Sequence, residues 1–305
     1  MFIELVKYGP PLIGLLLALC VWFIRSRSHV SLPRPARVST AIGLVVVLAL
    51  MIPFRAWTVW PWWTPQVDET GLHVLRLLAF GAPLLLSVIA MLFLLPTGQT
   101  ITPRGSAELA PRTLLTFAPR GVLLSAAAVV VLIVVVSVSA GLASSPDQDG
   151  RYLMFTVDAS ANSGGATNIY GWWFSIPCLI AITALIGLAL TELLAISRPP
   201  LAVDRLSDSR IRTTRVRNIL TVMIGGLLLH LGEVLLDLRG TSGLRLSFSS
   251  EPAGVISLGT SFAAIGPALL AASYVAITLG FAAWFAVLLS TVSAPVRRLS
   301  ESVQR

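Results

Sequence analysis

Residues 121–143 read GVLLSAAAVVVLIVVVSVSAGLA, an apolar run of 23 residues without a single charged side chain. A helix needs roughly 20 consecutive, mostly apolar residues to cross the hydrocarbon core of a bilayer. The run therefore predicts a transmembrane helix. It also indicates the class of protein to which the rest of the chain should belong.

The whole chain has the composition of a membrane protein. Of its 305 residues, 55% are hydrophobic and only 12% are charged, and the mean hydropathy is +0.85. Soluble globular proteins carry about 25% charged residues. This balance excludes a soluble enzyme, a disordered chain and an ordinary nucleic-acid-binding protein, so we expect no nucleic-acid partner.

Seven segments, 121–143 among them, have the length and hydropathy of a membrane span or come close to it. We predict an all-α membrane protein, a bundle of seven transmembrane helices that forms a single polytopic membrane domain over residues 1–305. The spans are expected near residues 9–24, 39–54, 72–95, 121–143, 171–197, 218–238 and 262–291.

The cations are distributed unevenly between the segments that connect these spans. Of the 22 Lys and Arg residues, 16 fall in segments 25–38, 96–120, 198–217 and 293–305, five fall in the alternate segments, and Arg76 lies inside a span. The positive-inside rule puts the larger set in the cytoplasm, so the N-terminus is expected outside and the C-terminus inside. The Arg-rich inner face should meet anionic lipid. Because the chain contains one lysine against 21 arginines, we expect a GC-rich bacterial genome and a bacterial cytoplasmic membrane.

Two connecting loops on the predicted outer side contain residues that favour strands. Residues 151–157 are rich in strand formers, whereas 158–167 are small and polar and predict a turn or loop. Residues 244–249 alternate apolar and polar side chains, 250–254 predict a turn, and 255–258 predict a returning strand. We therefore expect a small outer cap with short β-strands, and irregular loop packed on the helix ends is the alternative.

Ionisable side chains inside spans are rare, because each costs roughly 2.5–3.5 kcal/mol at the centre of a helix. The third span opens with His73 and Arg76, and the sixth carries His230, Glu233 and Asp237. Helical spacing places the last three on one face and the first two on a face of their own helix. Both groups lie in the outer halves of their spans, so they can meet if the two helices are neighbours.

Three interpretations of this polar intramembrane cluster compete. In the structural one, Arg76 pairs with Asp237 or Glu233, and the histidines complete a hydrogen-bond network that holds helices together. In the second, the carboxylates and histidines move protons or bind a cation or polar solute. In the third, His73, His230 and one carboxylate bind a metal, although the familiar H-E-x-x-H spacing is absent. The sequence names no metal and predicts no cofactor.

The seventh span repeats a small residue every four positions, at Ala264, Ala268, Ala272, Ala276 and Gly280. A row of small residues lets another helix approach closely. We predict a helix-packing ridge, which serves either contacts within this bundle or an interface with a second copy or another membrane protein.

No catalytic motif accompanies these features. The chain has no G-x-x-x-x-G-K phosphate loop and no nucleophile elbow, so the sequence does not predict an enzyme. The favoured hypothesis is a subunit or accessory or sensor component of a bacterial membrane complex. The alternative is a transporter or permease component that uses its intramembrane His, Glu and Asp residues to move protons or solute.

Overall fold

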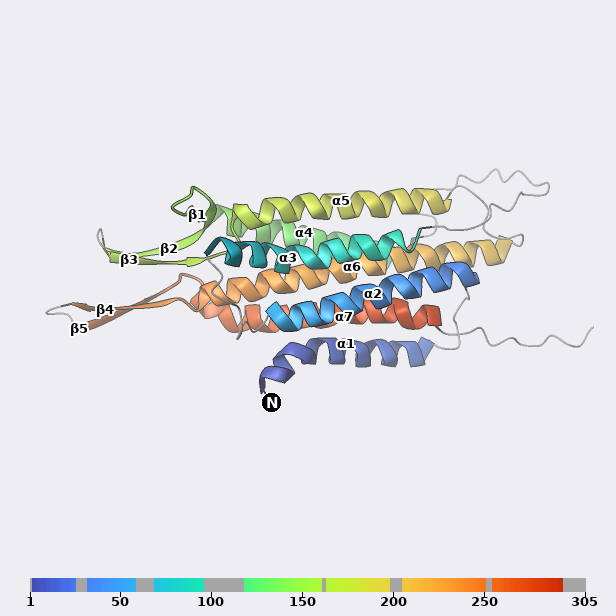
Figure 1. The fold of residues 1–305 in the computed structure, drawn as a ribbon, viewed down its shortest axis with the longest axis horizontal. Coiled ribbons are helices and arrows are strands. Elements are labelled where there is room, and N and C mark those ends of the chain that lie inside the picture. Colours follow the sequence, from blue (N-terminus) through green and yellow to red (C-terminus); the bar gives the residue numbers. More distant parts are fainter. Residues whose placement is uncertain are drawn as a thin grey trace, which may run out of the picture.

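The computed structural model describes residues 2–25, 32–58, 69–95, 118–160, 163–197, 205–250 and 254–292. Seven helices in this part of the chain run along a common long axis (Figure 1). They are α1 (Phe2–Arg25), α2 (Arg34–Thr58), α3 (Glu69–Leu92), α4 (Arg120–Leu142), α5 (Trp172–Ser197), α6 (Arg205–Ser242) and α7 (Gly266–Val292), the last preceded by the 3-10 turn η3 (Ala263–Ile265).

Six of these helices, α2 to α7, are long and apolar enough to cross a membrane, judged by length and composition. The fold is therefore that of an all-α, multi-pass membrane protein. Among the residues whose side chains the structure describes, helix α1 contributes the shorter apolar stretch Tyr8–Ile24. That residues 9–24 form a further span stays a prediction, and so does the orientation with the N-terminus outside. Many of the cations on which the orientation rests, in 26–31, 96–117 and 293–305, lie outside the described residues.

Helix α6 is the central element of the bundle. In its apolar window 78% of the residues are buried, against 39% or less in the other five long helices. It packs against α3, α4, α5 and α7, and α1 packs on the outside of α7. Burial on all sides is possible because the apolar residues of α6 are not confined to one stripe.

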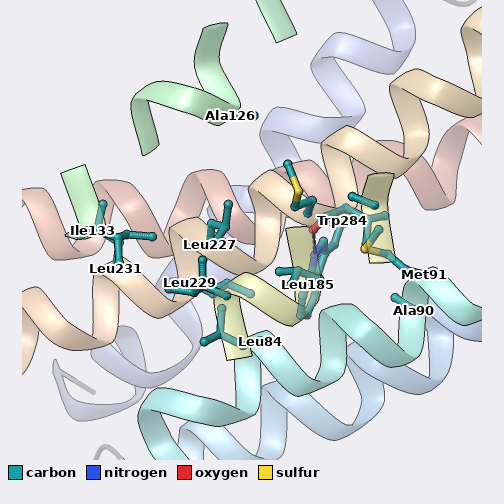
Figure 2. Close-up of a cluster of buried hydrophobic side chains, with 14 of the residues drawn as sticks. Leu84, Ala90, Met91, Ala126, Ile133, Leu185, Leu227, Leu229, Leu231 and Trp284 are labelled. Atoms are coloured by element: carbon teal, nitrogen blue, oxygen red, sulfur yellow. Dashed lines mark hydrogen bonds between the residues drawn. The ribbon is translucent and has the colours of Figure 1, made fainter. Parts of the chain in front are cut away.

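An apolar layer fills the middle of the bundle. Leu84, Leu185, Leu227, Leu229 and Trp284 are all fully buried in it (Figure 2). The indole Nε1–H donates a hydrogen bond of 3.0 Å to the Val222 carbonyl, which ties α7 to α6. This layer separates the polar groups at the two ends of α6.

The predicted small-residue ridge divides into two parts. Ala276 and Gly280 are buried, whereas Ala264, Ala268 and Ala272 are exposed. The buried part therefore serves packing within this bundle. Whether the exposed part meets a second copy or another protein stays a prediction.

We expect Gly280→Ala to lower the free energy of unfolding by about 1–3 kcal/mol, the usual cost of overpacking. A Cβ at position 280 would lie 2.8 Å from the Gly225 carbonyl oxygen and 3.0 Å from the Leu229 nitrogen, and backbone atoms cannot move aside cheaply. Chemical unfolding in mild detergent measures the effect. Gly187→Ala is the matched control, because nothing lies within 4 Å of that position; equal stability of the two variants would contradict the close approach of α6 and α7.

Five strands project beyond the helices at one end of the bundle, which we term the hairpin end (Figure 1). An antiparallel sheet contains β1 (Ser145–Pro146), β2 (Tyr152–Ser160) and β3 (Ser163–Asn168), and a hairpin contains β4 (Arg245–Ser250) and β5 (Gly254–Gly259). Strands β4 and β5 fall on the two stretches in which strands were expected. That this end faces outside the cell stays a prediction.

The loop predicted over 158–167 is wrong, because β2 continues through Ser160 and β3 occupies most of the remainder. Phe155 pairs with Thr167 and Val157 pairs with Gly165. A Cβ on Gly165 would lie 2.4 Å from Leu246 Cδ2, so the glycine lets β4 pack directly on β3. Pairing and packing override the weak strand propensity of this small, polar stretch. Residues 161–162 at its tip lie outside the described residues.

A tight turn between β1 and β2 is held by the carboxylate of Asp147. Its Oδ1 accepts hydrogen bonds from the backbone amides of Asp149 (2.9 Å) and Arg151 (2.8 Å), and its Oδ2 accepts one from Arg151 Nε (2.8 Å). Burial by itself raises the pKa of Asp147, but these hydrogen bonds and the Arg151 charge outweigh it and hold the pKa below its ordinary value of 3.8. The ionised form of Asp147 therefore stabilises the turn.

The sign of the pH dependence follows from this lowered pKa. The contribution of Asp147 should be fully present above the pKa of the unfolded chain, about 3.9, and lost as the pH falls through the lower native pKa. We expect Asp147→Asn to speed hydrogen exchange of the Asp149 and Arg151 amides at pH 5–7, and to make little difference once the pH lies below the native pKa. Exchange mass spectrometry of both proteins at each pH measures this. A difference that grows towards acid would contradict the assignment.

Candidate functional site

Helices α3 and α6 are neighbours, and together they line a cavity of about 270 Å³ at the hairpin end. Three of the five predicted cluster residues, Arg76, Glu233 and Asp237, line it, whereas His73 and His230 do not. The remaining lining comes from the end of α2, from α3 and α6, and from the end of β3: Thr58, Ala79, Phe80, Thr167, Asn168, Leu236, Gly240 and Thr241.

The end of β3 is fixed to the last turn of α6. The Thr241 hydroxyl donates a hydrogen bond of 2.8 Å to the Asn168 carbonyl. One step further along the chain, the Thr260 hydroxyl donates to the Ser242 carbonyl at 3.1 Å. The first bond holds the end of β3 against the cavity, so one wall of the site is strand and the others are helix.

The partner of Glu233 is Arg55, a residue that sequence reasoning missed. Arg55 Nε donates to Glu233 Oε1 at 2.9 Å, and the arginine side chain is only 1% exposed. From the sequence, Arg55 was expected in a connecting segment and Arg76 was the expected partner of Asp237 or Glu233; in the structure Glu233 pairs with Arg55. Helix α2 instead continues through Thr58 and carries Arg55 into the bundle.

A signal for Arg55 was present in the spacing of apolar residues. Leu44, Val47, Leu48 and Met51 form the buried face of α2, and Arg55 follows Met51 by four residues on the same face. A cation that continues an apolar stripe is a candidate for a buried ion pair. Its partner could not be identified in the same way, because it lies 178 residues away.

Arg76 and Asp237 face the cavity without forming an ion pair within 4.0 Å. The Tyr170 backbone amide donates to the Asp237 carboxylate, and the charge of Arg76 acts on it through space. Arg76 Nη1 and Asp237 Oδ2 are both buried and have no hydrogen-bond partner among the described residues. The cavity is therefore lined by one cationic and one anionic side chain that do not pair with each other.

His230 lies one turn deeper than Glu233 and is fully buried. Its Nδ1 lies 2.8 Å from the Phe80 carbonyl oxygen. Because a carbonyl can only accept, Nδ1 carries the hydrogen, and Nε2 is an acceptor with no partner in the described part of the chain. This bond ties α6 to α3 and ends the polar part of the site.

The two predicted histidines are separated by aromatic rings. His73 lies 6.4 Å from Phe174, Phe174 lies 5.5 Å from Phe80, Phe80 lies 4.8 Å from Tyr170, and Tyr170 lies 6.1 Å from His230, measured between ring centroids. Within the described ranges, no three His, Cys, Asp or Glu side chains are placed to hold a metal ion. The hypothesis of a metal shared by the two histidines thus gains no support from the residues that the structure describes.

A second cavity, of about 360 Å³, adjoins the first. It shares four lining residues with the first, Thr58, Arg76, Ala79 and Asn168. Its other walls are Trp57, Leu72 and Leu75, so it is mainly apolar, and Leu72 lies on the exposed surface of α3. The polar site therefore continues into an apolar recess beside Arg76.

The opposite end of α6 is more buried than the sequence indicated. The Arg-rich face was expected to meet anionic lipid, but Arg212 and Arg215 are only 0% and 7% exposed. Arg212 Nε pairs with Asp208 Oδ2 at 2.7 Å, and its Nη1 donates to the Ile196 carbonyl. Long helices pack around this end, so its arginines cannot all reach solvent. Arg210 remains exposed, and contact with anionic lipid stays a prediction.

No family model, curated protein or solved structure matches this chain. The class of protein is therefore set by the fold and the site together. It is a multi-pass membrane protein with a charged cavity at one end of its helical bundle.

Proposed function

We propose that the protein is a sensor or accessory subunit of a cell-membrane complex. In this proposal the cavity at the hairpin end binds a small ligand from the outer side, and α6 carries the effect of binding to the cytoplasmic end. The observation that carries the proposal is that a cavity lined by charged side chains stops at a buried apolar core.

The apolar core favours binding over conduction. A transport pathway needs polar groups or water along the whole depth of the membrane. Below His230 the next layer is Leu84, Leu227, Leu229 and Trp284, all of them fully buried. Along α6 the next polar side chains are Thr221 and Asn218, nine and 12 residues, or about 14 and 18 Å, further on. The buried Ser87 hydroxyl beside Gly226 donates its hydrogen bond to the Pro83 carbonyl of its own helix.

Helix α6 is suited to connect the two ends. It is continuous over 38 residues, which corresponds to about 57 Å. Asp237 and Thr241 line the cavity near one terminus, and the buried ion pair of Arg212 with Asp208 lies near the other. A ligand shifts such an element only if it binds two positions of the helix with different affinity. A partner that contacts the cytoplasmic end of α6 would detect the shift.

The orientation in the proposal follows the distribution of cations, which puts the hairpin end outside and the Arg-rich end in the cytoplasm. The exposed part of the small-residue ridge, Ala264, Ala268 and Ala272, offers a close-packing surface for another membrane subunit or a second copy.

The alternative is a transporter component, and one observation favours it. Pro83 lies inside α3, and its carbonyl accepts a hydrogen bond from the Ser87 hydroxyl at 2.7 Å. Prolines allow helices to bend at such points. In this alternative, bending of α3 would open the apolar core and let Glu233 and Asp237 pass on a proton or solute.

Purification of the full chain from its native membrane in mild detergent, with quantitative mass spectrometry of co-eluting proteins, tests the proposal. We expect one membrane partner to co-elute in fixed stoichiometry. The Asp237→Asn substitution should change the amount of partner retained, whereas Asp158→Asn, on the exposed strand β2, should not. A lone protein whose liposomes show a pH-driven solute flux that Asp237→Asn abolishes would overturn the proposal in favour of transport.

A further inference from the structure

One cation and two carboxylates line the first cavity, and the pairing of one carboxylate outside the lining limits the ligands that fit. Glu233 is already matched by Arg55, which leaves the facing pair of Arg76 and Asp237. Each of these two side chains has one buried atom without a hydrogen-bond partner among the described residues. An anion alone would satisfy Arg76 and leave Asp237 unmatched, and a cation alone would do the reverse.

A ligand with both charges satisfies both groups. A guanidinium binds phosphate or carboxylate oxygens through directed N–H donors. A carboxylate oxygen accepts hydrogen bonds from a primary ammonium, whereas a quaternary ammonium has no N–H to donate. Thr58 and Asn168 line both cavities and so connect the charged site with the apolar recess.

The second cavity adds an apolar requirement. Trp57, Leu72 and Leu75 extend the site sideways from Arg76, and Leu72 lies on the exposed surface of α3, where lipid would be. The two volumes, about 270 and 360 Å³, together fall within the usual range of ligand sites, about 300–1,000 Å³. A water-soluble zwitterion would use only the first cavity, and an amphiphile would use both.

We infer that the two cavities bind a zwitterionic amphiphile, with its oxyanion on Arg76, its primary ammonium on Asp237 and its apolar chain along Trp57 and Leu72. An aminophospholipid of the outer leaflet has this chemistry. The inference rests on the proposed function, because it names the ligand class of the same site. It needs no covalent step, since the geometry calls only for reversible binding.

Competitive lipid retention tests the inference. The full-length protein in detergent is mixed with equimolar dioleoyl phosphatidylethanolamine, phosphatidylcholine and phosphatidylglycerol, and the bound lipids are counted by native mass spectrometry. We expect the ethanolamine lipid to be retained over each of the other two by about tenfold, the loss expected from one missing charge-assisted hydrogen bond. Equal retention of the three lipids would overturn the inference without reference to any variant.

Two variants locate the selectivity. Asp237→Asn should abolish the preference for ethanolamine over choline, and Arg76→Gln should reduce retention of all three phospholipids. The charge-matched controls Asp158→Asn and Arg245→Gln, both on exposed strand residues, should keep the wild-type ratio. Each variant is compared only if it elutes as a single species like the wild type. Site variants that keep the wild-type ratio would overturn the assignment to this cavity.

A soluble competitor shows whether the site binds the intact lipid or only a free zwitterion with the same head group. If excess phosphoethanolamine displaces the lipid and depends on Asp237 in the same way, the head group dominates binding. If phosphoethanolamine binds and the lipid does not, the zwitterion site stands and the lipid source is overturned. All of these measurements use the isolated protein, so a failure to find a membrane partner, which would overturn the proposed function, leaves them unaffected.

Discussion

Arg55→Gln is expected to lower the free energy of unfolding by about 3–5 kcal/mol, because it leaves the Glu233 carboxylate buried without its cation. Removal of one partner from a buried ion pair costs far more than the pair itself contributes, since the remaining charge loses its compensation. Chemical unfolding of purified protein in mild detergent, followed by far-UV circular dichroism, measures the loss. Arg245→Gln, on an exposed strand, should change stability by no more than about 0.5 kcal/mol.

A double substitution distinguishes the effect of the ion pair on stability from the effect of side-chain size. Arg55→Met combined with Glu233→Met removes both charges and keeps apolar bulk, so we expect stability close to wild type or above it. Glu233→Met alone should be as damaging as Arg55→Gln. If the double variant is less stable than both single variants, the two residues do not act as a pair, and the geometry at 2.9 Å is not the origin of the effect.

The second large effect is expected at Trp284. Trp284→Ala should destabilise the fold by about 3–5 kcal/mol, because it leaves a cavity in the buried apolar layer shown in Figure 2. Lipid cannot enter this space, so the lost van der Waals contacts between α6 and α7 are not replaced. Trp284→Phe keeps most of the packing and removes the hydrogen bond to Val222, and it should cost only about 1 kcal/mol.

Comparison with a half-exposed tryptophan provides the control. Trp173, at the start of α5, is 44% exposed, and Trp173→Ala should be clearly milder than Trp284→Ala in the same unfolding measurement. Equal losses at the two positions would mean that the stability of the bundle does not depend on its central apolar layer.

The helices of this protein follow from the sequence because each apolar run is long and nearly free of charge. This reasoning does not predict where a helix ends when it continues beyond its apolar run. The second span was expected over 39–54, yet α2 continues through Thr58, and Arg55 pairs with a carboxylate inside the bundle. Helix α6 likewise extends to Arg205, well beyond its apolar core, because its arginines pack and pair within the protein.

The candidate site was predictable in part. Helical spacing placed Glu233 and Asp237 on one face, and both line the cavity with Arg76. Their functional role is still a prediction. Spacing along the chain does not show how the helices are arranged in space. It therefore predicted neither the pairing of Arg55 with Glu233 nor the presence of Asn168 from β3 in the cavity wall. Contacts between residues so far apart in the chain depend on packing that a single sequence does not display.

Cysteine accessibility along α6 tests most directly the central claim, that the charged cavity is closed by an apolar core. Gly240→Cys and Leu227→Cys are made in a variant without Cys20 and Cys178, and reconstituted vesicles are treated with a membrane-impermeant thiol reagent from one side at a time. The account predicts that Cys at 240 reacts from the hairpin side alone and that Cys at 227 reacts from neither side. Reaction of the cysteine at 227 from both sides would show a continuous aqueous path and would contradict the claim that the apolar core closes the cavity.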